Sequence, residues 1–174
     1  MTTSRDPESV SCIELGPTKW TQLEPYLAEI KKLEEEGVDD AALAFFEALL
    51  EDSEEGAIAP GDYKAPLGTT TMSVAPAWIG EFGRQGAHRK GEGGRREYRL
   101  YFGEAPHDGR SAVAALFAWK TAREMKEQAR HQTQSHRRTR SKAHVKQTTQ
   151  IGKAQSIVKR WATQESCTYR ILRR

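Results

Sequence analysis

Hydrophobic residues recur at helical spacing in two successive stretches near the amino terminus. One stretch runs from Thr18 to Gly37, and the next begins at Asp39 or Asp40, either of which can cap a helix. The apolar positions are Trp20, Leu23, Leu27, Ile30 and Leu33 in the first stretch and Leu43, Phe46, Leu49 and Leu50 in the second. The pattern predicts two helices that form an antiparallel hairpin. An alternating set within Ser9 to Leu15 predicts a short strand before them.

The middle of the chain shows apolar runs of strand length, separated by turn-forming residues. A loop rich in Gly, Pro and Thr, from Ser53 to Pro76, comes first and is anchored at Tyr63 and Leu67. The predicted strands are Ala77 to Arg84, Tyr98 to Phe102 and Ser111 to Trp119. The basic, glycine-rich residues 85–96 predict a flexible hairpin loop, and residues 106–109 predict a turn. The sequence thus predicts a meander of three antiparallel strands.

The carboxy-terminal part is basic and mostly helical in pattern. Residues 122–149 contain few large apolar side chains, so they predict either a solvated helix or a disordered basic arm. Helical spacing returns from Ile151 to Trp161, and Thr168 to Leu172 predict a last strand at the sheet edge. With residues 1–8 frayed, the pattern predicts one α+β domain over residues 1–174, in which the helical hairpin packs on a small antiparallel sheet.

The formal net charge of +3 conceals a strong asymmetry between the two ends of the chain. Residues 1–62 contain 16 acidic and 4 basic side chains, whereas residues 63–174 contain 8 acidic and 23 basic ones. A basic half is typical of nucleic-acid-binding proteins, because cations that neutralise phosphates release condensed counterions. The acidic half is open to three interpretations: it repels wrong ligands, it masks the basic half, or it is a solvated helical face.

The composition argues against several other classes of protein. No apolar run approaches the roughly 20 residues that a spanning helix needs, and residues 1–6 lack the apolar region of a signal peptide. We therefore expect a cytoplasmic protein without a membrane partner. Cys12 and Cys167 lie far apart and show no metal-type spacing, so we expect reduced cysteines, with neither a disulfide framework nor a zinc site.

The order and spacing of these elements resemble the RelE/HigB superfamily of type II toxins. The resemblance covers residues 10–121 and 150–172. It rests on Lys64 to Leu67, Trp78 to Arg84, Tyr98 to Phe102, Ala115 to Thr121 and Ile151 to Arg160. It implies a RelE-like fold with a basic arm inserted at 122–149, and an endoribonuclease without a cofactor that cuts messenger RNA, usually on the ribosome. It also implies a cognate antitoxin of the helix-turn-helix type, encoded beside the toxin.

The chemistry that the resemblance implies is attack of a ribose 2′-hydroxyl on the adjacent phosphorus, which leaves a 2′,3′-cyclic phosphate. A proton acceptor, a proton donor and cations for the phosphorane are needed. Arg suits the last task through its planar fork, and Lys is a base only where its pKa falls well below about 10.4. By resemblance, the catalytic candidates are Arg84, Arg99, Lys120, Arg123, Tyr169 and Arg170.

Aromatic side chains interspersed with cations suit single-stranded RNA. The candidates for RNA binding are Arg89, Lys90, Arg95, Arg96, Tyr101 and Trp119. Plainer interpretations stay open for both sets. Arg99 can pair with Glu81 or Glu97 across the sheet, Lys120 can merely end a strand, and the aromatic residues can serve only to pack.

Two functions other than catalysis also stay open. Trp119 and Gly83 stand where the family has a lysine and an arginine, which permits a toxin-like protein that binds nucleic acid without cleaving it. Alternatively, the acidic helices are a protein docking surface, and the chain is an interaction module of a mobile element. A steep dependence of RNA binding on salt distinguishes the first of these from the second, because phosphate contacts release counterions.

Overall fold

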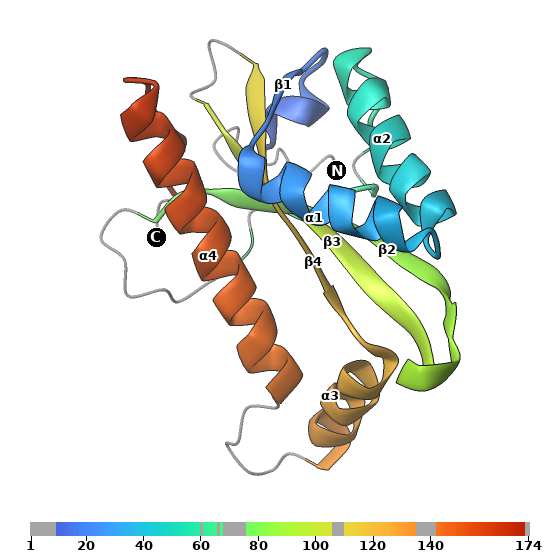
Figure 1. Ribbon diagram of the computed structural model, residues 1–174. Coiled ribbons are helices and arrows are strands. Elements are labelled where there is room, and N and C mark those ends of the chain that lie inside the picture. Colours follow the sequence, from blue (N-terminus) through green and yellow to red (C-terminus); the bar gives the residue numbers. More distant parts are fainter. Residues whose placement is uncertain are drawn as a thin grey trace, which may run out of the picture.

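The computed structural model describes residues 10–59, 61–65, 67, 76–105, 110–134 and 142–172. The predicted frayed segment at 1–8 and the predicted turn at 106–109 lie outside these residues. The described chain is an α+β structure, as predicted, with a four-stranded mixed sheet in the order β1-β4-β3-β2 (Figure 1). The strands are β1 (Lys19–Gln22), β2 (Ile79–Arg89), β3 (Gly94–Glu104) and β4 (Ser111–Lys120). The helices are α1 (Glu24–Glu36), α2 (Asp40–Glu54), α3 (Ala122–Gln134) and α4 (Lys142–Gln164).

The amino-terminal end differs from the prediction in two ways. The strand predicted within residues 9–15 is wrong, because Cys12–Glu14 form a short 3-10 helix that Ser11 caps. The first strand is instead Lys19–Gln22, which pairs in parallel with Ser111 to Ala114 of β4, so the sheet is mixed and not wholly antiparallel. Helix α1 consequently begins six residues later than Thr18, with Pro25 in its first turn, where the missing N–H costs nothing.

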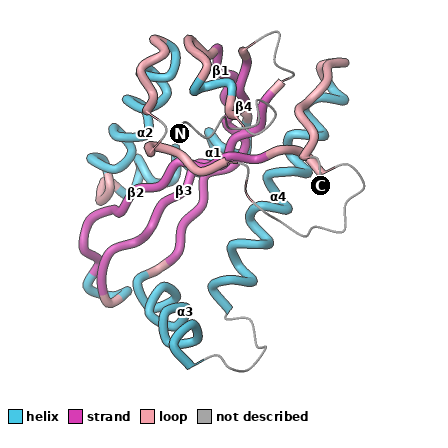
Figure 2. The backbone as a smooth tube through the Cα atoms, turned by 180° about the vertical axis from the view of Figure 1, so that it is seen from behind, coloured by secondary structure: helices cyan, strands magenta, loops and turns pink. Residues whose placement is uncertain are grey.

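The predicted meander is confirmed for β2, β3 and β4, which pair antiparallel in chain order. The flexible loop predicted at 85–96 is wrong, because β2 continues to Arg89 and β3 begins at Gly94. Only a 3-10 turn, Lys90–Glu92, separates the two strands. The long hairpin extends beyond the rest of the sheet, and α3 lies near its turn (Figure 2).

Side chains on the two faces of the sheet form two separate clusters of core residues. On one face, the predicted apolar stripe of α2 is buried against strand residues such as Leu100, Phe102 and Phe117. On the other face, α4 packs through Ile151, Ala154 and Val158. Successive strand residues point to opposite faces, so Leu100 contributes to the first cluster and Tyr101 to the second.

The carboxy-terminal region is more regular than the sequence indicates. Of the two alternatives for 122–149, the helix applies to both described parts, α3 and the start of α4, and residues 135–141 lie outside the described chain. The strand predicted at Thr168 to Leu172 is reduced to a single antiparallel bridge between Ala77 and Ile171. Backbone hydrogen bonds from Trp78 and Leu172 support that bridge. Within the described residues, no helix combines the length and apolar character that a membrane crossing requires.

Candidate functional site

An open cleft of about 390 Å³ lies at the β2 edge of the sheet, on the face that α4 partly covers. Its lining residues are Gly61, Asp62, Tyr63, Lys64, Glu81, Gly83, Arg84, Gln85, Glu97 and Arg99. One wall is the segment 61–65, which is fixed to β2 by a backbone bridge between Lys64 and Glu81, with N···O distances of 3.0 and 2.9 Å. The other wall consists of Glu81 and residues 83–85 of β2 and of Glu97 and Arg99 of β3. The sheet thus presents a row of charged side chains to an accessible space.

Arg99 is the centre of this row. Its Nη1 donates to Glu81 Oε1 and its Nη2 to Glu97 Oε1. The three side chains differ in exposure, at 11% for Arg99, 3% for Glu81 and 22% for Glu97. Within the described part of the chain, Glu81 Oε2 and Arg99 Nε have no hydrogen-bond partner. A buried polar atom without a partner is costly, so the hydrogen bonding of this pair is incomplete within the fold.

Burial shifts the proton affinity of two groups on this face in opposite directions. The pKa of Glu81 is raised, first by desolvation and then by the nearby Glu97 carboxylate, although Arg99 and Lys64 oppose the shift. The pKa of Lys120 is lowered, first by desolvation and then by the Arg99 guanidinium. Both shifts favour the neutral form of the group. Shifted groups of this kind beside a cleft are typical of sites that transfer protons.

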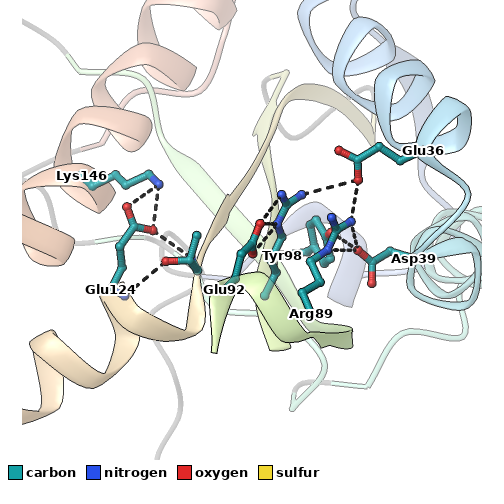
Figure 3. Close-up of polar contacts among 9 residues, drawn as sticks. Glu36, Asp39, Arg89, Glu92, Tyr98, Glu124 and Lys146 are labelled. Carbon is teal, nitrogen blue, oxygen red and sulfur yellow. Dashed lines mark hydrogen bonds and ion pairs between the residues drawn. The ribbon is translucent and has the colours of Figure 1, made fainter. Parts of the chain in front are cut away.

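Lys120 lies on the same face of the sheet but outside the cleft. Its cross-strand neighbour is Glu97, and the residue is only 1% exposed. The ammonium donates to Gln147 Oε1 at 2.8 Å and to Gln128 Oε1 at 3.2 Å, and these amides come from α4 and α3. An ion pair of 2.8 Å between Glu124 and Lys146 links the same two helices (Figure 3). Lys120 is thus covered by a pair of helices whose amides replace water around its charge.

Three of the other four catalytic candidates lie at three different places. Arg84 is exposed at the rim of the cleft, with its guanidinium carbon 4.3 Å from the centre of the Phe45 ring. Arg123 is exposed on α3. Tyr169 packs at the edge of the core cluster beneath α4. Neither Arg123 nor Tyr169 is among the residues that line the cleft. Of the catalytic candidates, the structure therefore brings only Arg84 and Arg99 together there.

Arg170 lies away from the cleft, beside the last residue of β3, and its contacts there are structural. The residue is buried, and its Nη1 donates to Glu104 Oε2 at 2.9 Å and to the Val10 carbonyl at 2.8 Å. Its guanidinium carbon also lies 4.4 Å from the centre of the Trp78 ring. These contacts fix the carboxy-terminal segment to the sheet and the amino-terminal segment.

Two of the predicted RNA-binding arginines are held by carboxylates. Arg89 Nη2 lies 2.6 Å from both Asp39 Oδ2 and Glu36 Oε2 (Figure 3). Arg96 Nη2 lies 2.6 Å from Glu92 Oε1. Asp39 and Glu36 precede α2 in the sequence, so the acidic half of the chain does neutralise part of the basic half. These ion pairs anchor the β2–β3 hairpin and reduce the positive charge that it presents.

The remaining RNA-binding candidates divide into buried aromatic and exposed basic side chains. Tyr101 is fully buried, and its hydroxyl donates to Gln150 Oε1 at 3.3 Å. Trp119 is half-buried, with the Arg96 guanidinium carbon 4.8 Å from its ring centre. Lys90 and Arg95 are exposed at the hairpin turn. Of the six candidates, these two basic residues are the ones with an exposed side chain.

Sequence reasoning missed Lys64, Glu81 and Glu97 as members of a site. It considered the two acids only as ion-pair partners of Arg99. A charged residue such as Glu81, which follows the apolar Ile79 on the inward side of a strand, is the signal that was available.

Comparison of the chain with protein-family models, curated proteins and solved structures found no significant match. The cleft itself is therefore the feature from which we infer a function.

Proposed function

We propose that this protein is an endoribonuclease that cleaves RNA in the cleft around Arg99. The observation that supports the proposal is one arginine between two carboxylates of different environment, one buried with a raised pKa and one partly exposed. Pairs of carboxyl groups whose environments differ divide the roles of acid and base between them. An arginine fork between them suits a phosphodiester, because it binds two phosphate oxygens at once.

In the proposed reaction, the phosphate replaces carboxylate oxygens on the Arg99 fork. Glu97, the more exposed acid, accepts the proton of the ribose 2′-hydroxyl, and the 2′-oxygen forms a bond to phosphorus. Glu81 holds its proton to higher pH because of burial, and it donates this proton to the 5′-oxygen as the P–O5′ bond breaks. The products are a 2′,3′-cyclic phosphate and a 5′-hydroxyl end. Arg99 stabilises the charge that develops on the phosphorane.

Lys120 has an indirect role in this proposal. Its ammonium is enclosed by Gln128 and Gln147, so it does not touch the substrate. Its charge influences Arg99 and both carboxylates from beneath the helices. We therefore assign Lys120 to positioning and electrostatic support, and we assign the proton transfers to the two glutamates.

The biological setting of the proposal comes from the sequence resemblance. A RelE-like toxin acts on messenger RNA, in this family usually on the ribosome, and is silenced by an antitoxin of the helix-turn-helix type. We propose these partners, the RelE-like arrangement and a cytoplasmic location for this protein. Arg84 and Arg99 are both candidates by resemblance and both line the cleft, and Arg99 is the one that two carboxylates hold at its centre.

The test is cleavage of an end-labelled single-stranded RNA by purified wild type and by Arg99→Ala, Glu81→Gln and Glu97→Gln variants. Loss of the acid, the base or the cation should each reduce the rate by roughly 10²- to 10⁴-fold, because each acts in the transition state. Glu47→Gln, an exposed position on α2, is the matched control and should cleave at the wild-type rate. New ends should carry a 5′-hydroxyl. Cleavage at the wild-type rate by all three site variants would refute the assignment.

A non-catalytic RNA-binding protein is the second candidate. The enclosure of Lys120 favours it, since a cation that the family uses in catalysis is covered here by α3 and α4. In that case wild type binds the labelled RNA without cleaving it, Arg99→Ala weakens binding, and induction of the protein in a bacterial host leaves both growth and transcripts unchanged.

A further inference from the structure

We propose that Arg84 and Phe45 form a subsite for the nucleotide next to the one whose phosphate binds Arg99, and that the substrate is consequently single-stranded. This inference rests on the proposed function, since it adds a neighbour to the same cleft. Arg84 lies one residue after Gly83, which is the cross-strand partner of Arg99. Since successive strand residues point to opposite faces, Arg84 presents its side chain over the edge of the sheet toward α2.

The chemistry at this rim differs from that around three other arginines of the hairpin. Arg89, Arg96 and Arg99 each have a carboxylate partner among the ion pairs of the described residues, whereas Arg84 has none there. Its guanidinium instead lies over the half-buried Phe45, at 4.3 Å from the ring centre. The ring holds one face of the guanidinium plane, so the opposite face and the N–H groups are accessible to a ligand.

The backbone beside Arg84 adds hydrogen-bond donors. The N–H and C=O of Glu81 point away from β3, because both bond to Lys64. Alternation along an antiparallel strand then directs the same groups of Gly83 and Gln85 outward, to the side of β2 on which the 61–65 segment forms one wall of the cleft. Both residues line the cleft. Outward N–H groups on a strand edge are suitable donors for phosphate oxygens.

Gly83 keeps the path between the two arginines open. A Cβ atom added there would have a single neighbour within 4 Å, the Tyr98 carbonyl oxygen at 3.8 Å. A nucleotide chain can therefore run from Arg99 across Gly83 to Arg84, with its phosphate on the strand edge and its base on the outer guanidinium face. Arg planes stack on bases that are unpaired, as in single strands and loops, whereas bases within a duplex are already stacked.

The test is binding of a short single-stranded RNA that carries a 2′-deoxy sugar at the cleavage position, so that it cannot be cut. Fluorescence anisotropy compares wild type with Arg84→Ala, Arg84→Lys and the exposed control Lys126→Ala on α3. Arg84→Ala should weaken binding by roughly 10-fold and reduce the slope of log K against log salt by about 0.7, because one phosphate contact and one stacking contact are lost. Arg84→Lys keeps the charge, so it should keep the salt slope and still bind less tightly than wild type.

The outcomes separate this inference from the proposed function. Wild-type cleavage with unchanged binding by Arg84→Ala would overturn the subsite and leave the ribonuclease standing. Weakened binding by Arg84→Ala without cleavage by wild type supports the subsite and refutes the ribonuclease. Equal affinity for a duplex of the same sequence would overturn the single-strand specificity.

Discussion

Asp39→Asn is the substitution for which the structure gives the clearest expected loss of stability. Asp39 precedes α2, and its carboxylate is completely buried. Oδ1 accepts from the Ala87 N–H at 2.6 Å. Oδ2 accepts from the Tyr98 hydroxyl, and also from Arg89 Nη2 at 2.6 Å and Arg89 Nε at 3.1 Å. The carboxylate thus connects the turn between two helices to both strands of the long hairpin (Figure 3).

The expected loss in the free energy of unfolding follows from the contacts that remain after Asp39→Asn. An amide keeps one acceptor oxygen, but its NH₂ group faces donors, and Arg89 loses the partner that compensates its partly buried charge. Breaking a buried ion pair by removing one partner costs roughly 3–5 kcal/mol, and we expect about 3 kcal/mol here because Glu36 still contacts Arg89. At a urea dependence of about 2 kcal/mol per M, the unfolding midpoint falls by about 1.5 M.

The assay is urea unfolding followed by tryptophan fluorescence, with Glu36→Gln as the matched control. Glu36 contacts the same arginine but is 42% exposed, so its loss should cost less than about 1 kcal/mol. Hydrogen bonds from Tyr98, Arg89 and Ala87 hold the pKa of Asp39 below its ordinary value. Its stabilisation is therefore present above about pH 3.9 and is lost as the pH falls through the lowered pKa. Equal midpoints for the two variants, or a difference that stays constant to pH 2, would refute the reasoning.

Three further predictions concern the sheet. Gly80→Ala should lower the free energy of unfolding in urea by about 1–3 kcal/mol, since its Cβ would lie 2.3 Å from Phe102 Cζ. Gly83→Ala should change it by less than about 1 kcal/mol, since its Cβ would make only an ordinary contact of 3.8 Å with the Tyr98 carbonyl oxygen. Glu81→Gln should remove a pH dependence of the free energy of unfolding. Because its pKa is raised, the wild-type carboxyl contributes stability below about pH 4.3, and this contribution is lost as the pH rises through the raised pKa. Unfolding curves of both proteins across that pH window test this. Because the pKa of Lys120 is lowered, wild type should gain stability as the pH rises from that lowered pKa toward about 10.4. Lys120→Met should abolish this gain, as measured by thermal unfolding in alkaline buffers. A Lys120→Met protein that still gains stability in that range would contradict the burial argument.

The elements that the sequence predicts are those in which a local pattern and burial coincide. Phe46 and Leu50 recur on one face of α2 because that face packs on the sheet. Strand β1 has no comparable signal, since most of its four residues are exposed and its pairing partner lies in β4. The hairpin from Gln85 to Arg96 has a loop-like composition, yet it is a strand pair because acids from a distant part of the sequence bind its arginines.

In the candidate site, too, the sequence reveals what a local pattern marks and misses what only the fold brings together. Arg99 could be selected from the sequence, because it is a cation within the predicted strand Tyr98 to Phe102. Its partnership with Glu81 depends on strand register, and the enclosure of Lys120 depends on where α3 and α4 return to the sheet. Neither relation is local in sequence, so no periodicity or spacing rule can reveal it.

The parallel pairing of β1 with β4 also orders events during synthesis. Thr21 pairs with Val113, so about 90 residues must be added before the strand meets its partner. At roughly 5–20 residues per second, the ribosome takes on the order of 5 to 20 s to make that stretch. Meanwhile α1 and α2 have no sheet to cover, and their apolar faces are exposed on the nascent chain. Strand β1, which is the first strand in the sequence and lies at an edge of the sheet, is therefore among the last strands that can join it.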